Sequence, residues 1–206
     1  EFNLVGTRIR SLLTNVRTKS SPASDGETVL FGNENGEVVA VSLADFKIKY
    51  RKKISEGFEG GVSIDGTNAY IGDNSGKMYS LRVEDGSINW EFDTKKKIIS
   101  TPVFNESQIM IGNLNGDIFC FDKNNGTVNW HIFTGGVINA TPLLSKNFLL
   151  QPDFNRKVYF INTEDGRIKR TIEFEGRIKL SPVLYDGVLY FGSDKGKIDA
   201  YAANSK

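Results

Sequence analysis

Short apolar segments separated by polar, glycine-containing turns run through the whole chain, and residues 97–133 show the pattern most clearly. Four segments, at 97–103, 108–112, 117–122 and 127–133, are rich in β-branched and aromatic residues, with Asn, Asp and Gly between them. The second and third are almost continuously apolar, as strands covered on both faces are, whereas the fourth alternates and indicates one face in water. Segments of this length between such turns predict hairpins, and therefore a four-stranded antiparallel meander.

This unit recurs five times at a spacing of forty residues, without insertion or deletion. One column of the repeat holds proline and three hold glycine, each with a single exception: Pro22, Val62, Pro102, Pro142 and Pro182; Gly32, Gly72, Gly112, Pro152 and Gly192; Gly36, Gly76, Gly116, Arg156 and Gly196; Gly6, Phe46, Gly86, Gly126 and Gly166. A fixed period of this length marks an architecture in which one supersecondary unit is stacked. Sheets covered in the middle and half-exposed at the outer strand favour an all-β, five-bladed β-propeller; a linear β-solenoid with shorter coils that pair in parallel is the alternative.

The two ends of the chain predict how the ring closes. Residues 6–15 match only the fourth-strand columns, and residues 177–202 supply the first three strands of a fifth unit. We therefore expect one domain over residues 1–206, in which the N-terminal strand joins the last blade and removes an open sheet edge. The expected blades are about 17–56, 57–96, 97–136, 137–176, and 177–206 together with 1–16.

Composition narrows the possible partners. Lys and Arg (26) nearly cancel Asp and Glu (25), so nucleic acid is not an obvious partner. The apolar runs are far shorter than a bilayer crossing requires, so we expect no membrane span. We also expect a monomer. Cys120 is the only cysteine. Its column otherwise holds small or apolar residues, which favours a buried side chain over the alternative of a reactive thiol.

A recurring motif carries a family resemblance. The stretch from Cys120 to Trp130 resembles the A-x-D-x-x-T-G-x-x-x-W motif of quinoprotein alcohol dehydrogenase propellers. Ser80 to Trp90 is a second copy, and the stretches ending at Tyr50 and Arg170 are degraded copies. The chain thus resembles the pyrroloquinoline-quinone-like (PQQ-like) repeat superfamily, which includes the BamB type of outer-membrane assembly lipoprotein.

The resemblance implies a propeller in which Trp90, Trp130 and, as a milder variant, Tyr50 dock against the neighbouring blade. It also implies a periplasmic or other extracytoplasmic location. Members of the superfamily more commonly have six to eight blades, so a piece of a larger ring and an engineered assembly remain alternatives.

Candidate chemistry is sparse. Quinone-dependent dehydrogenases of this superfamily use an Asp base, a calcium ion and an adjacent-cysteine disulfide, and a single cysteine excludes that disulfide. His131, the only histidine, lies in an outer strand at a position expected to face solvent. The Asn- and Asp-containing turns at 73–76 and 113–116 lack the terminal Glu of a calcium loop and fit tight turns instead. We expect no catalytic residue, no metal site and no cofactor.

The most suggestive cluster is basic. Arg17, Lys97 and Arg177 share one column, and Lys19 and Lys179 share a column two residues later. In a ring these positions converge on one mouth of the central channel, where they could attract an acidic peptide or a small anion; a solvated rim without a ligand is the alternative.

These observations predict a non-catalytic scaffold that binds another protein or a peptide. The resemblance implies a more specific form of this function, a cell-envelope assembly factor. A small-ligand or anion binder that uses the basic channel mouth is the second hypothesis. A fragment or relative of a quinone-dependent dehydrogenase is the third.

Overall fold

The computed structural model describes residues 10–202, which form nineteen β-strands in five separate antiparallel sheets and no helix. The first sheet contains β1 (Ala23–Ser24), β2 (Thr28–Gly32), β3 (Glu37–Ser42) and β4 (Ile48–Lys53). The second contains β5 (Ser63–Asp65), β6 (Asn68–Gly72), β7 (Lys77–Arg82) and β8 (Ile88–Asp93). The third contains β9 (Val103–Phe104), β10 (Gln108–Gly112), β11 (Asp117–Asp122) and β12 (Val128–Phe133).

The last two sheets differ in their number of strands. The fourth contains β13 (Leu143–Ser145), β14 (Phe148–Pro152), β15 (Lys157–Asn162) and β16 (Ile168–Glu173). The fifth contains only β17 (Val183–Tyr185), β18 (Val188–Gly192) and β19 (Ile198–Ala202) within the described residues. The four-stranded meander expected from the sequence is confirmed in the first four sheets, and antiparallel pairing throughout excludes the parallel solenoid.

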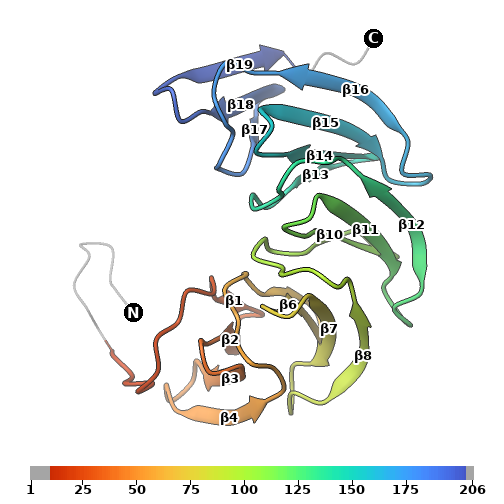
Figure 1. Ribbon diagram of the computed structural model, residues 1–206. Coiled ribbons are helices and arrows are strands. Elements are labelled where there is room, and N and C mark those ends of the chain that lie inside the picture. Colours follow the sequence, from red (N-terminus) through yellow and green to blue (C-terminus); the bar gives the residue numbers. More distant parts are fainter. Residues whose placement is uncertain (1–9, 203–206) are drawn as a thin grey trace.

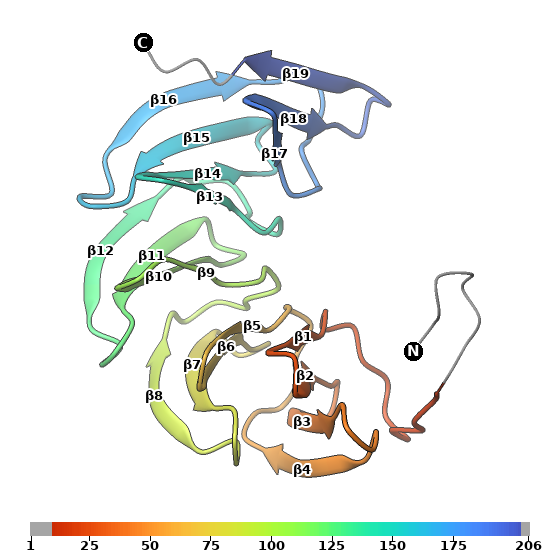
Figure 2. The ribbon, with the colours of Figure 1, turned by 180° about the vertical axis from the view of Figure 1, so that it is seen from behind.

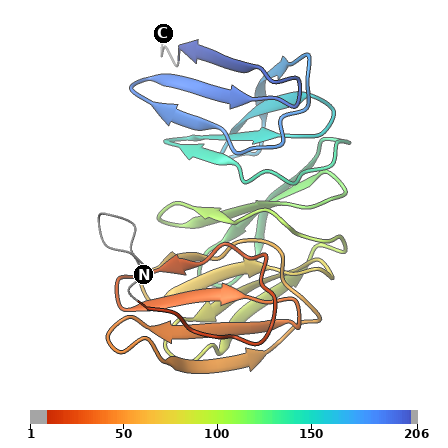
Figure 3. The ribbon, with the colours of Figure 1, turned by 90° about the vertical axis from the view of Figure 1, so that its left-hand side faces the viewer.

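The five sheets follow one another along an arc (Figure 1). The short first strands line the concave side, and β4, β8, β12 and β16 form the convex side, as the view from behind also shows (Figure 2). From the side, the sheets are successive layers of a stack (Figure 3). In each of the four complete sheets the register shifts between the third and fourth strands, at Ala40/Val41, Ser80/Leu81, Cys120/Phe121 and Phe160/Ile161. Bulges of this kind bend and twist the outer strand.

The apolar core lies between successive sheets. Leu30 of the first sheet packs with Ile71 of the second, and Tyr70 of the second with Ile111 of the third. The repeating glycine column makes this approach possible: a Cβ added at Gly72 would lie 2.3 Å from Cγ2 of Ile98, in the connector that leads to the third sheet. Similar contacts would form at Gly32 and Gly112. Each interface is therefore built from the same columns of the repeat.

Among the described residues, no layer follows the fifth sheet. Tyr190 and Ile198 are 37% and 77% exposed. Their counterparts in the other sheets are at most 3% exposed: Leu30, Tyr70, Met110, Leu150, Val38, Met78, Ile118 and Val158. The next sheet covers this face in each of the first four sheets. Within residues 10–202, the same face of the fifth sheet is exposed.

The predicted closing strand is wrong for residues 10–15, which form no strand; residues 6–9 of that prediction lie outside the described residues. Arg10 donates hydrogen bonds to the carbonyl oxygens of Leu43 and Ala44, and Leu12 packs against a cluster that contains Phe31. In the described part of the chain no layer precedes the first sheet, so Leu12 covers apolar side chains that would otherwise face water. Arg10 also stands in the tryptophan column and supplies no docking ring. The described residues form an arc rather than a closed ring.

Candidate functional site

Three aromatic side chains at the outer strands contact the next sheet. Trp90 Nε1 donates to the carbonyl oxygen of Lys123 at 3.0 Å, and Trp130 Nε1 donates to that of Thr163 at 2.7 Å. Tyr50 Oη donates to the Val83 carbonyl at 2.9 Å. Each ring also lies over the glycine of a turn in the next sheet, Gly86, Gly126 or Gly166, where an added Cβ would clash with the ring. These contacts link neighbouring blades.

The side of the arc that carries the sequence-predicted cluster is here called the connector side. It comprises the turns between the second and third strands of each sheet and the segments that connect one sheet to the next. Its turns are held by buried side chains: Asp73 Oδ1 accepts hydrogen bonds from the backbone amides of Ser75, Gly76 and Lys77. Asn33, Asn113 and Asp153 accept equivalent amide bonds. These Asx side chains therefore shape turns, as the sequence analysis expected.

The second oxygen of Asp73 joins two sheets. Asp73 Oδ2 accepts hydrogen bonds from Ser55 Oγ at 2.8 Å and Tyr79 Oη at 3.0 Å. Burial, followed by the charge of Asp73, raises the pKa of Tyr79 above its ordinary value. Tyr159 and Asp153 repeat this bond at 2.9 Å. The connector side is therefore a stiff frame, because its turns are fixed by buried polar contacts.

The basic column lies directly on this frame. The carbonyl oxygens of Arg17, Lys97 and Arg177 accept hydrogen bonds from the turn amides of Glu34, Leu114 and Asp194, at 2.9–3.0 Å. All three residues thus stand at equivalent places in their sheets. Because the first and fifth sheets are at opposite ends of the arc, the structure does not bring Arg17 and Arg177 together (Figure 1).

Acidic neighbours pair with the cations of the first three sheets. Arg17 Nε lies 3.2 Å from Glu34, Lys19 Nζ lies 3.1 Å from Glu34 and 3.3 Å from Glu59, and Lys97 Nζ lies 3.1 Å from Glu59. Hydrogen bonding to Glu34, and then to Glu59, raises the pKa of Lys19. The bond from Lys97 first, and that from Lys19 after the opposing effect of burial, lower the pKa of Glu59. This end of the connector side carries an alternating charge network, and Glu34 is a member that sequence reasoning missed.

At the other end of the arc the arrangement differs. Lys179 Nζ lies 3.4 Å from Asp194, whereas the Arg177 guanidinium lies over the Phe154 ring at 5.9 Å from its centroid. The Arg177 amide also donates to Asp194 Oδ1 at 2.8 Å, which fixes the backbone beside the guanidinium.

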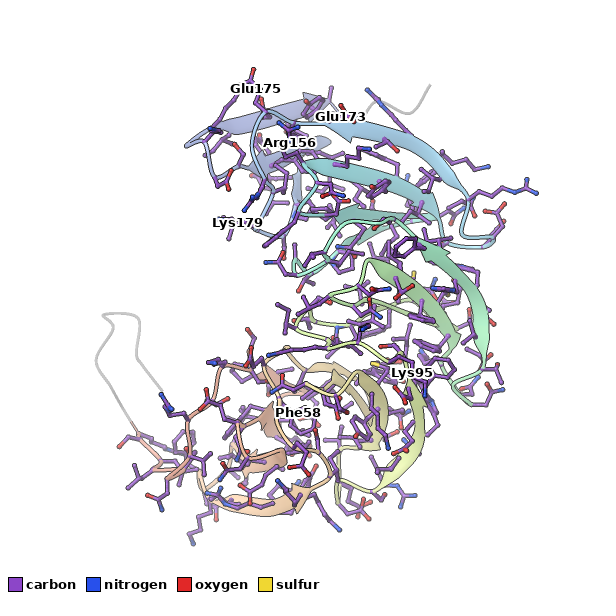
Figure 4. The ribbon with its side chains drawn as sticks, viewed as in Figure 1. Phe58, Lys95, Arg156, Glu173, Glu175 and Lys179 are labelled. Carbon is purple, nitrogen blue, oxygen red and sulfur yellow. The ribbon has the colours of Figure 1, made fainter. Side chains whose placement is uncertain are left out.

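Arg177 contributes to a pocket of about 780 Å³ between the fourth and fifth sheets. Its walls come from the β14–β15 turn, the connector that follows β16, and the β18–β19 turn: Phe154, Asn155, Arg156, Lys157, Glu173, Phe174, Glu175, Gly176, Arg177, Asp194 and Lys195. Figure 4 shows Arg156, Glu173 and Glu175 at this end of the arc. The sequence signal for the pocket is Arg156, the one departure from its glycine column.

The remaining candidate residues have ordinary environments. His131 Nε2 lies 2.9 Å from Asp117 Oδ1, and its ring stacks on Phe119 at 4.4 Å. Cys120 is fully buried, and burial raises the pKa of its thiol to about 12. Among residues 10–202, no group of three or more His, Cys, Asp or Glu side chains is placed to hold a metal ion. The same residues include no helix long and apolar enough to cross a bilayer.

Comparisons with known proteins identify the same architecture. A family profile described as outer membrane protein assembly factor BamB matches residues 48–147 and 115–205. The crystal structure of BamB from Moraxella catarrhalis has a TM-score of 0.81 at 21% identity, over 91% of this chain and 59% of that chain. The crystal structure of the computationally designed Ika8 protein has a TM-score of 0.79 at 11% identity, over 88% of this chain and 57% of that chain. Among curated proteins, none matches this chain in sequence.

These two solved structures are therefore longer than this chain, which spans less than two thirds of each. The predicted all-β propeller fold with PQQ-like repeats is confirmed.

Proposed function

Because this chain belongs to the family described as outer membrane protein assembly factor BamB, we propose that it is a non-catalytic scaffold that binds another protein during assembly at the cell envelope. The observation that carries the proposal is the connector side itself. Its turns are fixed by buried Asx side chains, while exposed polar and charged side chains project from them. Binding residues commonly lie on loops held by a rigid scaffold.

Two other functions are less well supported. A quinone-dependent dehydrogenase of the type that the motif resembles would use an adjacent-cysteine disulfide, and the chain has one cysteine. An anion binder at the predicted basic cluster would need available cations, but the ammonium groups of Lys19 and Lys97 are engaged by Glu34 and Glu59. Pairing of this kind lowers the net positive field on the first three sheets.

Photo-crosslinking tests the scaffold proposal. A photoreactive residue at Lys96, an exposed position of the connector side, is compared with one at Asn124, an exposed turn position at the opposite ends of the strands. In envelope extracts of the native host, we expect Lys96 to crosslink to a protein of outer-membrane assembly and Asn124 not to do so. Equal crosslinking from both positions, or none from Lys96, would refute the proposed face.

A second measurement tests catalysis. The purified protein is supplied with pyrroloquinoline quinone, calcium and a series of alcohols, and the reduction of an electron-accepting dye is followed. We expect no reduction above the rate without protein. Dye reduction that depends on all three additions would replace the scaffold proposal with the dehydrogenase alternative.

A further inference from the structure

The pocket between the fourth and fifth sheets lies at a departure from the repeat. In the first three sheets, the glycine of this column lies tightly under the connector to the next sheet: an added Cβ would meet a backbone atom at 1.8 Å at Gly36, 2.5 Å at Gly76 and 2.7 Å at Gly116. Arg156 occupies the same column with φ of 65°, a left-handed conformation that favours glycine. In the fourth sheet a side chain therefore stands where the first three sheets have none, and Arg156 lines the pocket together with the connector residues Glu175 and Gly176.

The backbone around the pocket is well held. The carbonyl oxygen of Arg156 accepts a hydrogen bond from the Phe174 amide at 2.8 Å, and the Phe154 amide donates to the Val137 carbonyl at 2.9 Å. Arg177 and Asp194 also exchange bonds: the Arg177 amide donates to Asp194 Oδ1 and the Asp194 amide donates to the Arg177 carbonyl. The backbone that carries each arginine is therefore held by hydrogen bonds.

Four cationic and three acidic side chains line the pocket. Each acidic residue has a lysine partner: Glu173 pairs at 3.5 Å with Lys157, which is also a wall residue, Glu175 with Lys197 at 4.0 Å and Asp194 with Lys179 at 3.4 Å. By contrast, Arg156, Arg177 and Lys195 form no ion pair with any residue of the described chain. Three cations thus remain available around one cavity.

The size and lining of the pocket indicate which anion it takes. A volume of about 780 Å³ far exceeds the space needed by one carboxylate or phosphate group. A largely polar wall is unlike the apolar lining of most small-molecule sites. Guanidinium groups bind carboxylates through paired, charge-assisted hydrogen bonds, and the Phe154 ring holds one guanidinium in place.

We propose that this pocket binds the acidic side chains of a peptide segment from a protein partner, with Arg156 and Arg177 as carboxylate ligands and Lys195 as a supporting cation. The proposal rests on the scaffold function proposed above and names the chemistry of the partner. It also places one contact with that partner at the fifth-sheet end of the connector side, beyond the ion-paired network of the first three sheets.

Fluorescence polarisation tests the proposal with a fluorescein-labelled peptide of alternating Glu and Gly, and with the matching Gln and Gly peptide as control. We expect the Glu peptide alone to bind, and the affinity to fall as salt rises. Arg156→Gly restores the residue that the other sheets carry, so it should fold normally while it removes one of the two carboxylate ligands. Arg156→Gly and Arg177→Gln should each weaken binding by about tenfold or more, since each removes a charge-assisted bond.

Lys169→Gln is the matched control, because Lys169 is an exposed lysine of β16 outside the pocket; it should change the affinity by less than about twofold. Equal losses from Lys169→Gln and Arg156→Gly, or no binding of the Glu peptide, would overturn the proposal. Binding of inorganic phosphate without binding of the Glu peptide would also overturn it. If the crosslink from Lys96 still forms in any of these cases, the pocket assignment alone has failed and the scaffold function stands.

Discussion

A pair of matched glycine substitutions tests the stacking of the sheets. Gly72 and Gly192 occupy the same column of the repeat, and neither has a left-handed backbone. A Cβ at Gly72 would lie 2.3 Å from Ile98 Cγ2 and 2.6 Å from Ile98 Cβ. A Cβ at Gly192 would meet only Leu180 Cδ1, at an ordinary contact distance of 3.7 Å. The two sites differ because, in the part of the chain that the structure describes, a layer follows the second sheet and none follows the fifth.

The expected magnitudes follow from this geometry. Gly72→Ala forces extra volume into a packed interface, which costs about 1–3 kcal/mol. Both substitutions also restrict the unfolded chain, which stabilises the protein by about 0.4–1 kcal/mol where the native conformation is unstrained. Gly192→Ala should therefore be neutral or slightly stabilising. The unfolded-state effect is common to both variants, so the difference of about 1–3 kcal/mol reports the steric contact alone.

Equilibrium urea unfolding followed by far-ultraviolet circular dichroism supplies the measurement, since this signal comes from the strands of all five sheets. A lowered midpoint for Gly72→Ala and an unchanged or raised midpoint for Gly192→Ala are expected. If Gly192→Ala is as destabilising as Gly72→Ala, another layer must cover the fifth sheet, and the open arc is refuted.

Three further predictions concern the interior and the charge network. Each Trp→Phe substitution removes a hydrogen-bond donor to a backbone carbonyl. The carbonyl of Thr163, the partner of Trp130, keeps a second donor, Gln108 Nε2 at 3.1 Å. Trp90→Phe should therefore lower the unfolding free energy in urea by about 1 kcal/mol more than Trp130→Phe. Burial raises the pKa of the Cys120 thiol from an ordinary 9.0 to about 12. The thiol's contribution to stability is therefore intact below pH 9 and falls above it, where the thiol ionises in the unfolded chain. Between pH 8 and 10 the wild type should lose about 1 kcal/mol more unfolding free energy than Cys120→Ala. An NMR titration of Glu59 should give a midpoint below its ordinary pKa of 4.5. The ion pairs of Glu59 should then persist at pH 4.5 and above, and weaken as the pH falls through the lowered midpoint. Lys97→Met should raise the midpoint, because it removes the hydrogen bond that lowers this pKa most.

The sequence was sufficient to predict the repeating unit because the constraint on each column is local and recurs. Alternation in the fourth strand marks the half-exposed outer face, and the glycine column that includes Gly72 marks the close approach of the next sheet. The role of Asp73 in its turn could also be predicted, because an Asx side chain that accepts hydrogen bonds from nearby amides depends only on the local sequence. Features of this kind need no knowledge of the distant chain.

Contacts between different columns were harder to predict. The pairing of Lys19 and Lys97 with Glu59 crosses sheet boundaries and depends on side-chain reach, so the basic column alone suggested more free charge than the structure has. The closing strand failed over residues 10–15 for a similar reason. A match to the fourth-strand columns does not determine which sheet a segment packs against. Leu12 packs against apolar side chains of the first sheet instead of the fifth.

The exposed face of the fifth sheet affects where the molecule unfolds locally in solution. In a stack in which each layer is stabilised mainly by its neighbours, a terminal layer with a single neighbour unfolds at lower free-energy cost than one held from both sides. Backbone amides of β18 should therefore exchange with deuterium sooner than those of β10, although both are the central strands of their sheets. The arginine-lined pocket, shared between the fourth and fifth layers, would then form and dissolve with the least protected part of the stack.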